Sequence, residues 1–180
     1  VSWSESEDER PFNFASKQDD WYVAGDWGTP VGVRWDQPTP GTYRKNRPTD
    51  WPDTLAYWLA GFSGPSVEVA QGTIEFFRAT FTLSATTNVG VYATADDICE
   101  VYLNGHLIID SDDEDVTQWT RFFEYHNTLP AGTYLLAARA KNGIYFGFNP
   151  LAFILTVTTI DGDLNPGTVL FRTNTTQWKV

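Results

Sequence analysis

Apolar and polar residues alternate along much of the chain after residue 72. One run is TIEFFRATFTLS (73–84), and another follows at residues 89 to 95. The apolar positions that share one face in these runs are Phe77, Ala79, Phe81 and Leu83, then Val89, Val91, Ala93 and Ala95. A period of two residues is typical of a β-strand that buries one face. Both runs are therefore predicted to be half-buried strands.

A hairpin is predicted next, in the stretch ATADDICEVYLNGHLI (93–108). Asn104-Gly105 separates the alternating residues 99–103 from the apolar residues 107–109, and both turn residues tolerate the positive φ of a type I′ turn. Further strands are expected at 118–127, 133–141, 150–160, 168–172 and 176–180, each bounded by Gly, Pro, Asn or Asp. This spacing indicates an all-β fold, an antiparallel β-sandwich, and not alternating βαβ units.

The chain divides by composition into two parts. Residues 151–160 are apolar on both faces, which predicts a central strand whose outer face is covered. The expected cover is the N-terminal third, which holds six of the 8 tryptophans: Trp3, Trp21, Trp27, Trp35, Trp51 and Trp58. Residues 1–50 are interpreted as an acidic arm and an irregular Trp-rich wrap, and residues 51–180 as the sandwich. The stretch DTLAYWLA (53–60) is compatible with a short helical turn capped by Asp53 or with a strand.

Charge excludes several classes of partner. The 180 residues include 12 Lys and Arg against 23 Asp and Glu, a formal net charge of −11. Such a surface repels phosphate, so neither nucleic acid nor anionic lipid is an expected partner. No apolar run approaches the roughly 18 residues of a spanning helix, so membrane insertion is not expected. Cys99 is the only cysteine, which leaves no intrachain disulfide to form. The start at Val1 and the absence of methionine lead us to expect a fragment or a piece of an assembly.

Five ordered blocks of sequence resemble the galactose-binding-like jelly-roll domain. They are WPDTLAYWLAG (51–61), GTIEFFRATFTL (72–83), ATADDICEVYLNG (93–105), LPAGTYLLAARAKN (129–142) and PLAFILTV (150–157). The resemblance implies a jelly-roll sandwich in which Asp96 and Asp97 occupy a strand-to-strand corner and Asn104-Gly105 a hairpin turn. At such a corner, short carboxylates accept hydrogen bonds from turn amides. A metal or ligand contact is the alternative role for the two aspartates.

The C-terminal string GTVLFRTNTTQWKV (167–180) is similar to the segment that closes such a domain in minor tail proteins of phages infecting actinobacteria. This resemblance implies a virion component, located in the phage tail and thus extracellular. Its expected partners are other tail proteins, further copies of itself and host surface carbohydrate. A longer polypeptide beyond Val180 is then also expected.

The acidic run DSDDEDV (110–116) is a candidate calcium site, with Asp110, Asp112, Asp113 and Asp115 as oxygen ligands. It lacks the glycine and the distal glutamate of an EF-hand loop, and a solvated acidic loop needs no ion. Both interpretations stay open. DGDLN (161–165) is a weaker candidate that also reads as an ordinary turn. No other cofactor is expected.

Two connections carry candidate glycan-binding residues. In domains that bind glycans, an aromatic face stacks on the sugar while polar side chains bond its hydroxyls. The candidates are Tyr145 and Phe146, with Phe148 beside them, in KNGIYFGFNP (141–150), and Asp112, Asp113, Trp119 and Arg121 on a second rim. The alternative is that these aromatic residues seal the core end or a protein interface.

Catalysis is not expected. GFSGP (61–65) fails the Gly-x-Ser-x-Gly pattern of a nucleophile elbow, and His106 and His126 have no zinc-site spacing. A non-catalytic structural or adhesion domain of a phage tail is the first interpretation. A secreted carbohydrate-binding module or adhesin is the second, and an accessory domain of a glycoside hydrolase is the third.

Overall fold

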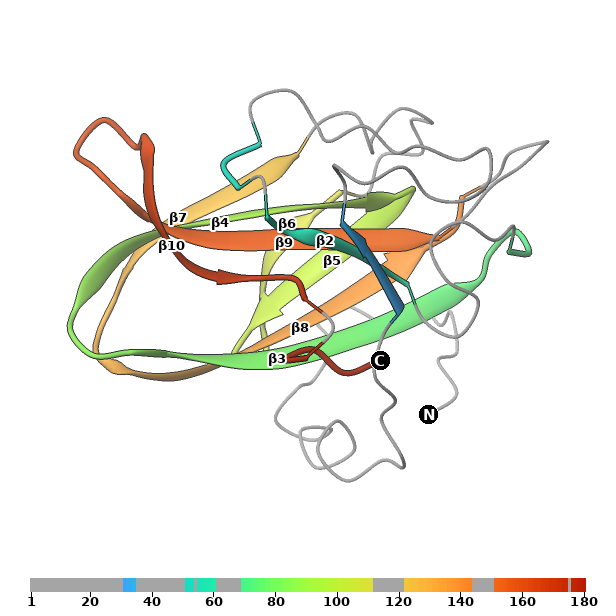
Figure 1. Cartoon of the computed structure of the whole chain (residues 1–180), viewed down its shortest axis with the longest axis horizontal. Helices are drawn as coiled ribbons and strands as arrows, with labels where there is room; N and C mark the ends of the chain where they lie inside the picture. Colours follow the sequence, from blue (N-terminus) through green and yellow to red (C-terminus); the bar gives the residue numbers. More distant parts are fainter. Residues whose placement is uncertain are drawn as a thin grey trace.

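The computed structural model describes residues 31–34, 51–53, 55–60, 69–111, 122–143, 151–174 and 176–180. In these residues all regular structure is β-strand, arranged as two sheets that face each other (Figure 1). The strands are β1 (Val31–Arg34), β2 (Tyr57–Ala60), β3 (Ile74–Leu83), β4 (Thr87–Asp96), β5 (Ile98–Leu103), β6 (His106–Asp110), β7 (Phe123–Leu129), β8 (Gly132–Lys141), β9 (Ala152–Ile160) and β10 (Pro166–Arg172). No helix of the described residues has the length and apolar character to cross a membrane.

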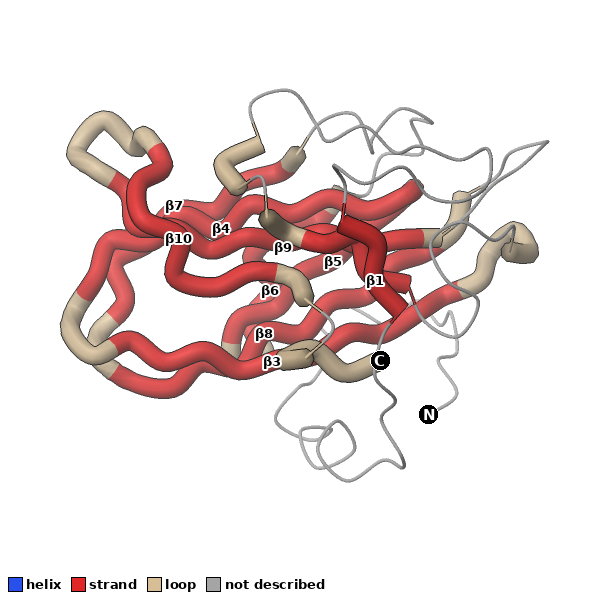
Figure 2. The backbone as a smooth tube through the Cα atoms, viewed as in Figure 1, coloured by secondary structure: helices blue, strands red, loops and turns tan. Residues whose placement is uncertain are grey.

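Every strand pairing is antiparallel. One sheet has the order β1-β2-β9-β4-β7, with β10 also pairing to β9, and the other has the order β3-β8-β5-β6. Figure 2 shows the two layers as tubes that run along the long axis of the molecule. The antiparallel β-sandwich predicted from the alternating pattern is confirmed.

The core lies between the two layers. It is formed by the alternate residues that the sequence pattern placed on one face, such as Phe77 on β3 and Leu155 on β9, both fully buried. The rings of Phe77 and Phe153 stack across the layers with centroids 5.4 Å apart. Burying a side chain of this size stabilises the fold by roughly 1.5 to 3 kcal/mol, so this layer is the main source of stability.

The second apolar cluster confirms that β9 is buried on both faces. On the outer face of the six-stranded sheet, Trp51 and Ala56 pack with Tyr92, Ala152 and Ile154. Between these two covering residues, Asp53 forms an ion pair in which the Arg172 Nε lies 2.8 Å from the Asp53 Oδ2. The described part of the cover therefore begins at Trp51, and residues 1–30 and 35–50 lie outside the described residues.

The stretch 53–60 contains a strand, so the helical alternative is wrong. Residues 57–60 form β2, which pairs with β1 and meets β9 through Leu59 and Phe153. The Asp53 carboxylate accepts a bond of 2.9 Å from the amide of Leu55, two residues on, which is an Asx turn and not a helix cap. Burial of Leu59 against the core explains why the extended conformation prevails.

Two strand predictions had wrong bounds. The strand predicted at 118–127 runs from Phe123 to Leu129, because β7 pairs with β4 as far as Leu129 opposite Thr87. The segment 176–180 contributes a single bridge, between Lys179 and Arg78, and not a full strand. Its Trp178 turns into the core, where the buried ring lies against Phe153 and Phe171.

Candidate functional site

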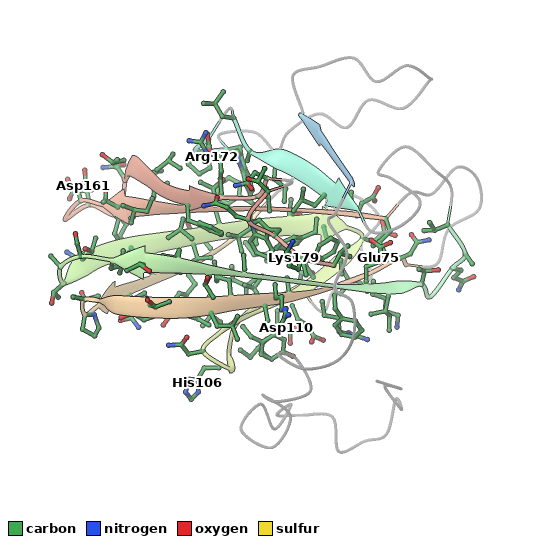
Figure 3. All side chains as sticks on the ribbon, turned by 60° about the horizontal axis from the view of Figure 1, so that its bottom comes forward. Glu75, His106, Asp110, Asp161, Arg172 and Lys179 are labelled. Atoms are coloured by element: carbon green, nitrogen blue, oxygen red, sulfur yellow. The ribbon has the colours of Figure 1, made fainter. Side chains whose placement is uncertain are left out.

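The strand register brings several connections to one end of the sandwich. Asp96 at the end of β4 pairs with Ala152 at the start of β9, and Ile98 at the start of β5 pairs with Lys141 at the end of β8. The connections 112–121 and 144–150 leave from this same end, which we call the loop end. Figure 3 shows Glu75, near the start of β3, and Asp161, after β9, at opposite ends of the molecule.

Asp96 and Asp97 form the step between the two sheets. Asp96 is the last residue of β4 in the six-stranded sheet, and the amide of Asp97 donates a bond of 3.2 Å to the Lys141 carbonyl in the four-stranded sheet. Their shared peptide bond is cis. Both side chains are buried, at 3% and 5% exposure, and the Asp97 Oδ2 accepts a bond of 2.8 Å from the Gly143 amide. The corner implied by the family resemblance is present.

Asn142 lies beside this step and holds the approach to β3. Its side-chain amide donates to the carbonyls of Val69 and Ala70, both at 3.1 Å. Its backbone amide donates to Thr73 at 2.8 Å, and its carbonyl accepts from Gly72 at 3.0 Å. The fully buried Asn142 Oδ1 has no hydrogen-bond partner among the described residues. Asn142 therefore links the β2–β3 and β8–β9 connections at the loop end.

Cys99 also lies near the loop end, but its thiol is not poised to react. Its backbone amide donates to the Ser111 hydroxyl at 2.7 Å, and the thiol is buried in the core. Burial raises the pKa of the Cys99 thiol to about 12, with smaller contributions from the Asp110 and Glu100 charges. A neutral thiol at this position is a core side chain and not a nucleophile.

Two predicted turns lie away from the loop end. Asn104 and Gly105 have φ of 47° and 85° and join β5 to β6, and the Asn104 Oδ1 accepts a bond from the Leu135 amide at 2.8 Å. In the DGDLN turn the Asp161 Oδ1 accepts from the amides of Asp163 and Asn165 at 2.9 and 2.8 Å. The hydrogen bonds from Asn165 lower the pKa of the Asp161 carboxyl. The Asp161 carboxylate therefore accepts hydrogen bonds within the turn, as the turn interpretation of DGDLN predicts.

Of the remaining predicted site residues, Asp110 belongs to the part of the chain that the structure describes. Asp110 is the last residue of β6, opposite Glu100 in the register with β5. Among the described residues no three acidic, His or Cys side chains form a metal-binding group. The others lie outside the described residues: Asp112, Asp113, Asp115, Trp119, Arg121, Tyr145, Phe146 and Phe148.

Asn142 and Gly143 were missed as site residues from the sequence. Their signal was the Asn-Gly pair in KNGIYFGFNP, immediately before the aromatic residues that were singled out. An Asn-Gly pair predicts a turn, but it does not predict which distant side chain the turn amide meets. Here that side chain is Asp97, 46 positions away in the sequence.

No protein-family model matches the sequence, and no curated protein matches it. Solved structures with a similar fold include an α-L-rhamnosidase from Streptomyces avermitilis complexed with L-rhamnose. It superimposes with a TM-score of 0.54 at 19% identity, over 67% of this chain and 12% of the rhamnosidase chain. A lectin from Pleurotus ostreatus in complex with GalNAc superimposes with a TM-score of 0.51 at 16% identity, over 84% of this chain and 39% of the lectin chain.

These similarities show a shared β-sandwich fold. This chain matches a small part of the rhamnosidase and less than half of the lectin, so neither whole protein's activity transfers with the fold. Neither is a phage tail protein, and the tail-protein interpretation stays a prediction without support from the comparisons.

Proposed function

We propose that this chain is a non-catalytic carbohydrate-binding domain whose sugar binds at the loop end. The observation that carries the proposal is the pair of buried carboxylates, Asp96 and Asp97, where the sheets meet and several connections converge. Sugar hydroxyls are hydrogen-bond donors, and carboxylate and amide oxygens are their natural acceptors. The two structural neighbours support the choice of ligand class, because each was solved with a sugar bound.

The loop end can supply both kinds of contact that a sugar needs. In this proposal Asp96 and Asp97 provide the acceptors. Asp96 is the last residue of β4 and Asp97 lies between β4 and β5, so the two sheets hold both residues in place. In this proposal the stacking surface comes from Trp119, Tyr145 and Phe146, and further hydroxyl contacts come from Asp112, Asp113 and Arg121. Both groups belong to connections that start at this end. The described aromatic residues nearby, Trp51 and Phe122, pack edge to face at 5.9 Å and cover the sheet instead.

We also propose that a calcium ion bound by the acidic run contributes to the sugar site. The acidic run that begins at Asp110 leaves β6 at the loop end, and hard cations prefer carboxylate oxygens. Binding that disappears with EDTA and returns with Ca²⁺ would assign the ion a role at the sugar site. Binding that is indifferent to EDTA would leave the acidic run as a solvated loop.

A glycan array with three proteins tests the proposed function. The wild type is compared with an Asp96→Asn/Asp97→Asn double variant and with Asp161→Asn, which alters a carboxylate at the opposite end. We expect the wild type and Asp161→Asn to bind the same glycans, and the double variant to bind at least about tenfold more weakly. An array on which the wild type binds nothing, or a double variant that binds like the wild type, would refute the proposal.

Such a domain can serve in three settings: a secreted module or adhesin, an accessory domain beside a glycoside hydrolase, or a tail tip that contacts host glycan. The proposed sugar binding is common to all three. The complete gene product that contains this chain distinguishes them, since a hydrolase domain or other tail domains would be encoded with it.

A further inference from the structure

The two carboxylate oxygens of Asp97 have different surroundings. Oδ2 accepts the Gly143 amide at 2.8 Å, whereas none of the described residues donates a hydrogen bond to Oδ1. The side chain as a whole is only 5% exposed. Oδ1 is not among the fully buried polar atoms that lack a partner, so it keeps contact with the surface and is the oxygen of this pair that a ligand donor would reach.

Gly143 fits against Asp97 only because it lacks a side chain. A Cβ atom at position 143 would lie 2.9 Å from the Asp97 Oδ2 and 3.3 Å from its Cβ and Cγ. Contacts near 2.9 Å require one partner to move. The Asp97 backbone has little freedom to do so, because its amide is bonded to the Lys141 carbonyl. The side chain would therefore have to rotate, and Oδ1 would rotate with it.

The neighbouring residues keep the Gly143 amide in place. Asn142 makes four hydrogen bonds to residues 69, 70, 72 and 73, two from its side chain and two from its backbone. Lys141 is the last residue of β8 and pairs with Ile98. The Gly143 amide, which donates to Oδ2, therefore follows directly after two residues that are held by hydrogen bonds to other segments.

We infer that Gly143 is a positioning residue for the sugar site, and this inference rests on the proposed function. The Gly143 amide donates a charge-assisted hydrogen bond to the Asp97 Oδ2. This bond fixes the orientation of the carboxylate, so that Oδ1 is the oxygen that accepts from the ligand. A sugar, or a cation that holds a sugar, then contacts Asp97 through Oδ1 alone. Preorganisation of this kind gives affinity, because the binding group need not be ordered when the ligand arrives.

The experiment compares Gly143→Ala with Gly167→Ala. At position 167 a Cβ would also approach a side-chain oxygen, the Thr159 Oγ1 at 2.5 Å, but in the hairpin at the opposite end. Affinities for L-rhamnose, GalNAc and the best array glycan are measured at a temperature where circular dichroism shows every variant folded. We expect Gly143→Ala to bind about tenfold more weakly than the wild type and Gly167→Ala to bind equally well. A residue with a merely structural role would change the unfolding temperature and leave the affinity of the folded protein unchanged.

A second variant, Asp97→Asn, keeps the test decisive if Gly143→Ala fails to fold. The asparagine carbonyl can accept the Gly143 bond, which places the amide group where Oδ1 was, and that group donates instead of accepting. We expect sugar affinity to fall while the unfolding temperature changes little. Wild-type affinity in either folded variant would overturn the inference while the proposed function stands. Failure of the wild type to bind any sugar would overturn both.

Discussion

The Glu100 carboxylate lies 2.9 Å from the Arg139 guanidinium on the outer face of the four-stranded sheet. The two residues are directly opposite in the register of β5 and β8, and the Tyr102 hydroxyl donates to the second carboxylate oxygen at 2.6 Å. Their side chains are only 14% and 11% exposed. This cross-strand cluster is a more stabilising arrangement than an ion pair in open solvent, because water screens it less.

We predict that Glu100→Ala lowers the free energy of unfolding by about 2 kcal/mol, between the values for exposed and fully buried ion pairs. Denaturation in urea measures the change. Glu124→Ala is the matched control, since Glu124 is 54% exposed and lies 3.4 Å from the His126 Nε2. It should cost less than about 0.5 kcal/mol. Equal losses for the two variants would show that burial does not strengthen the Glu100 pair.

Trp178→Ala should be among the most damaging substitutions. The side chain is fully buried, its ring contacts Phe153 and Phe171, and its indole N–H donates to the Arg172 carbonyl at 3.0 Å. Removal of a large buried aromatic side chain costs about 3 to 5 kcal/mol. Trp178→Phe keeps most of the packing and loses the hydrogen bond, so it should cost less. Guanidinium denaturation that finds the two variants equally stable would contradict this account of the C-terminal segment.

Because the Cys99 thiol is buried, we predict that the fold loses stability at alkaline pH. Its pKa is raised from an ordinary 9.0 to about 12 in the folded protein, so between these values the unfolded chain binds fewer protons than the folded one. Stability conferred by this group is complete below about pH 9 and falls as pH rises toward 12, by at most about 1.4 kcal/mol per pH unit. Cys99→Ala should reduce the slope. An unchanged slope of stability against pH in Cys99→Ala, or rapid reaction of the native thiol with a thiol reagent at pH 8, would contradict this prediction.

Substitution of Gly105 by alanine should destabilise the fold more than the same substitution of Gly162. Gly105 has a φ of 85°, so Gly105→Ala should destabilise the fold by about 1 kcal/mol. Gly162 lies in the exposed turn after β9, where a Cβ would meet nothing within 4 Å. Gly162→Ala should therefore stay within about 0.5 kcal/mol of the wild type. Thermal unfolding of both variants measures the difference, and an equal effect would mean that the turn conformation is not what Gly105 provides.

Local pattern was sufficient to predict the layers of this fold. The alternation at Phe77–Leu83 and Val89–Ala95 places each side chain on its observed face, because the period of a strand fixes that choice. Residues 53–60 were ambiguous because a short apolar run suits helix and strand equally, and a tertiary contact between Leu59 and Phe153 decides the outcome. The C-terminal residues were read as a strand, although Trp178 contributes packing and only Lys179 pairs.

The candidate site was predictable only in part. The corner at Asp96-Asp97 could be expected from the resemblance, since acidic residues between two strand patterns are ordinary turn formers. That this corner carries the chain from one sheet to the other depends on strand order, which the pattern does not encode. The same holds for the contact of Asp97 with Gly143 and for the pairing of Glu100 with Arg139, each of which joins residues far apart in the sequence.

Sugar binding at the loop end is tested most directly by NMR. The uniformly ¹⁵N-labelled protein is titrated with the best-binding glycan, and the shifts of backbone amides are followed residue by residue. The account predicts saturable shifts at Asp97 and Gly143, with the amides around Asp161 and Gly105, both away from the loop end, unchanged. Saturable shifts confined to the Asp161 end, or none at any sugar concentration, would contradict it.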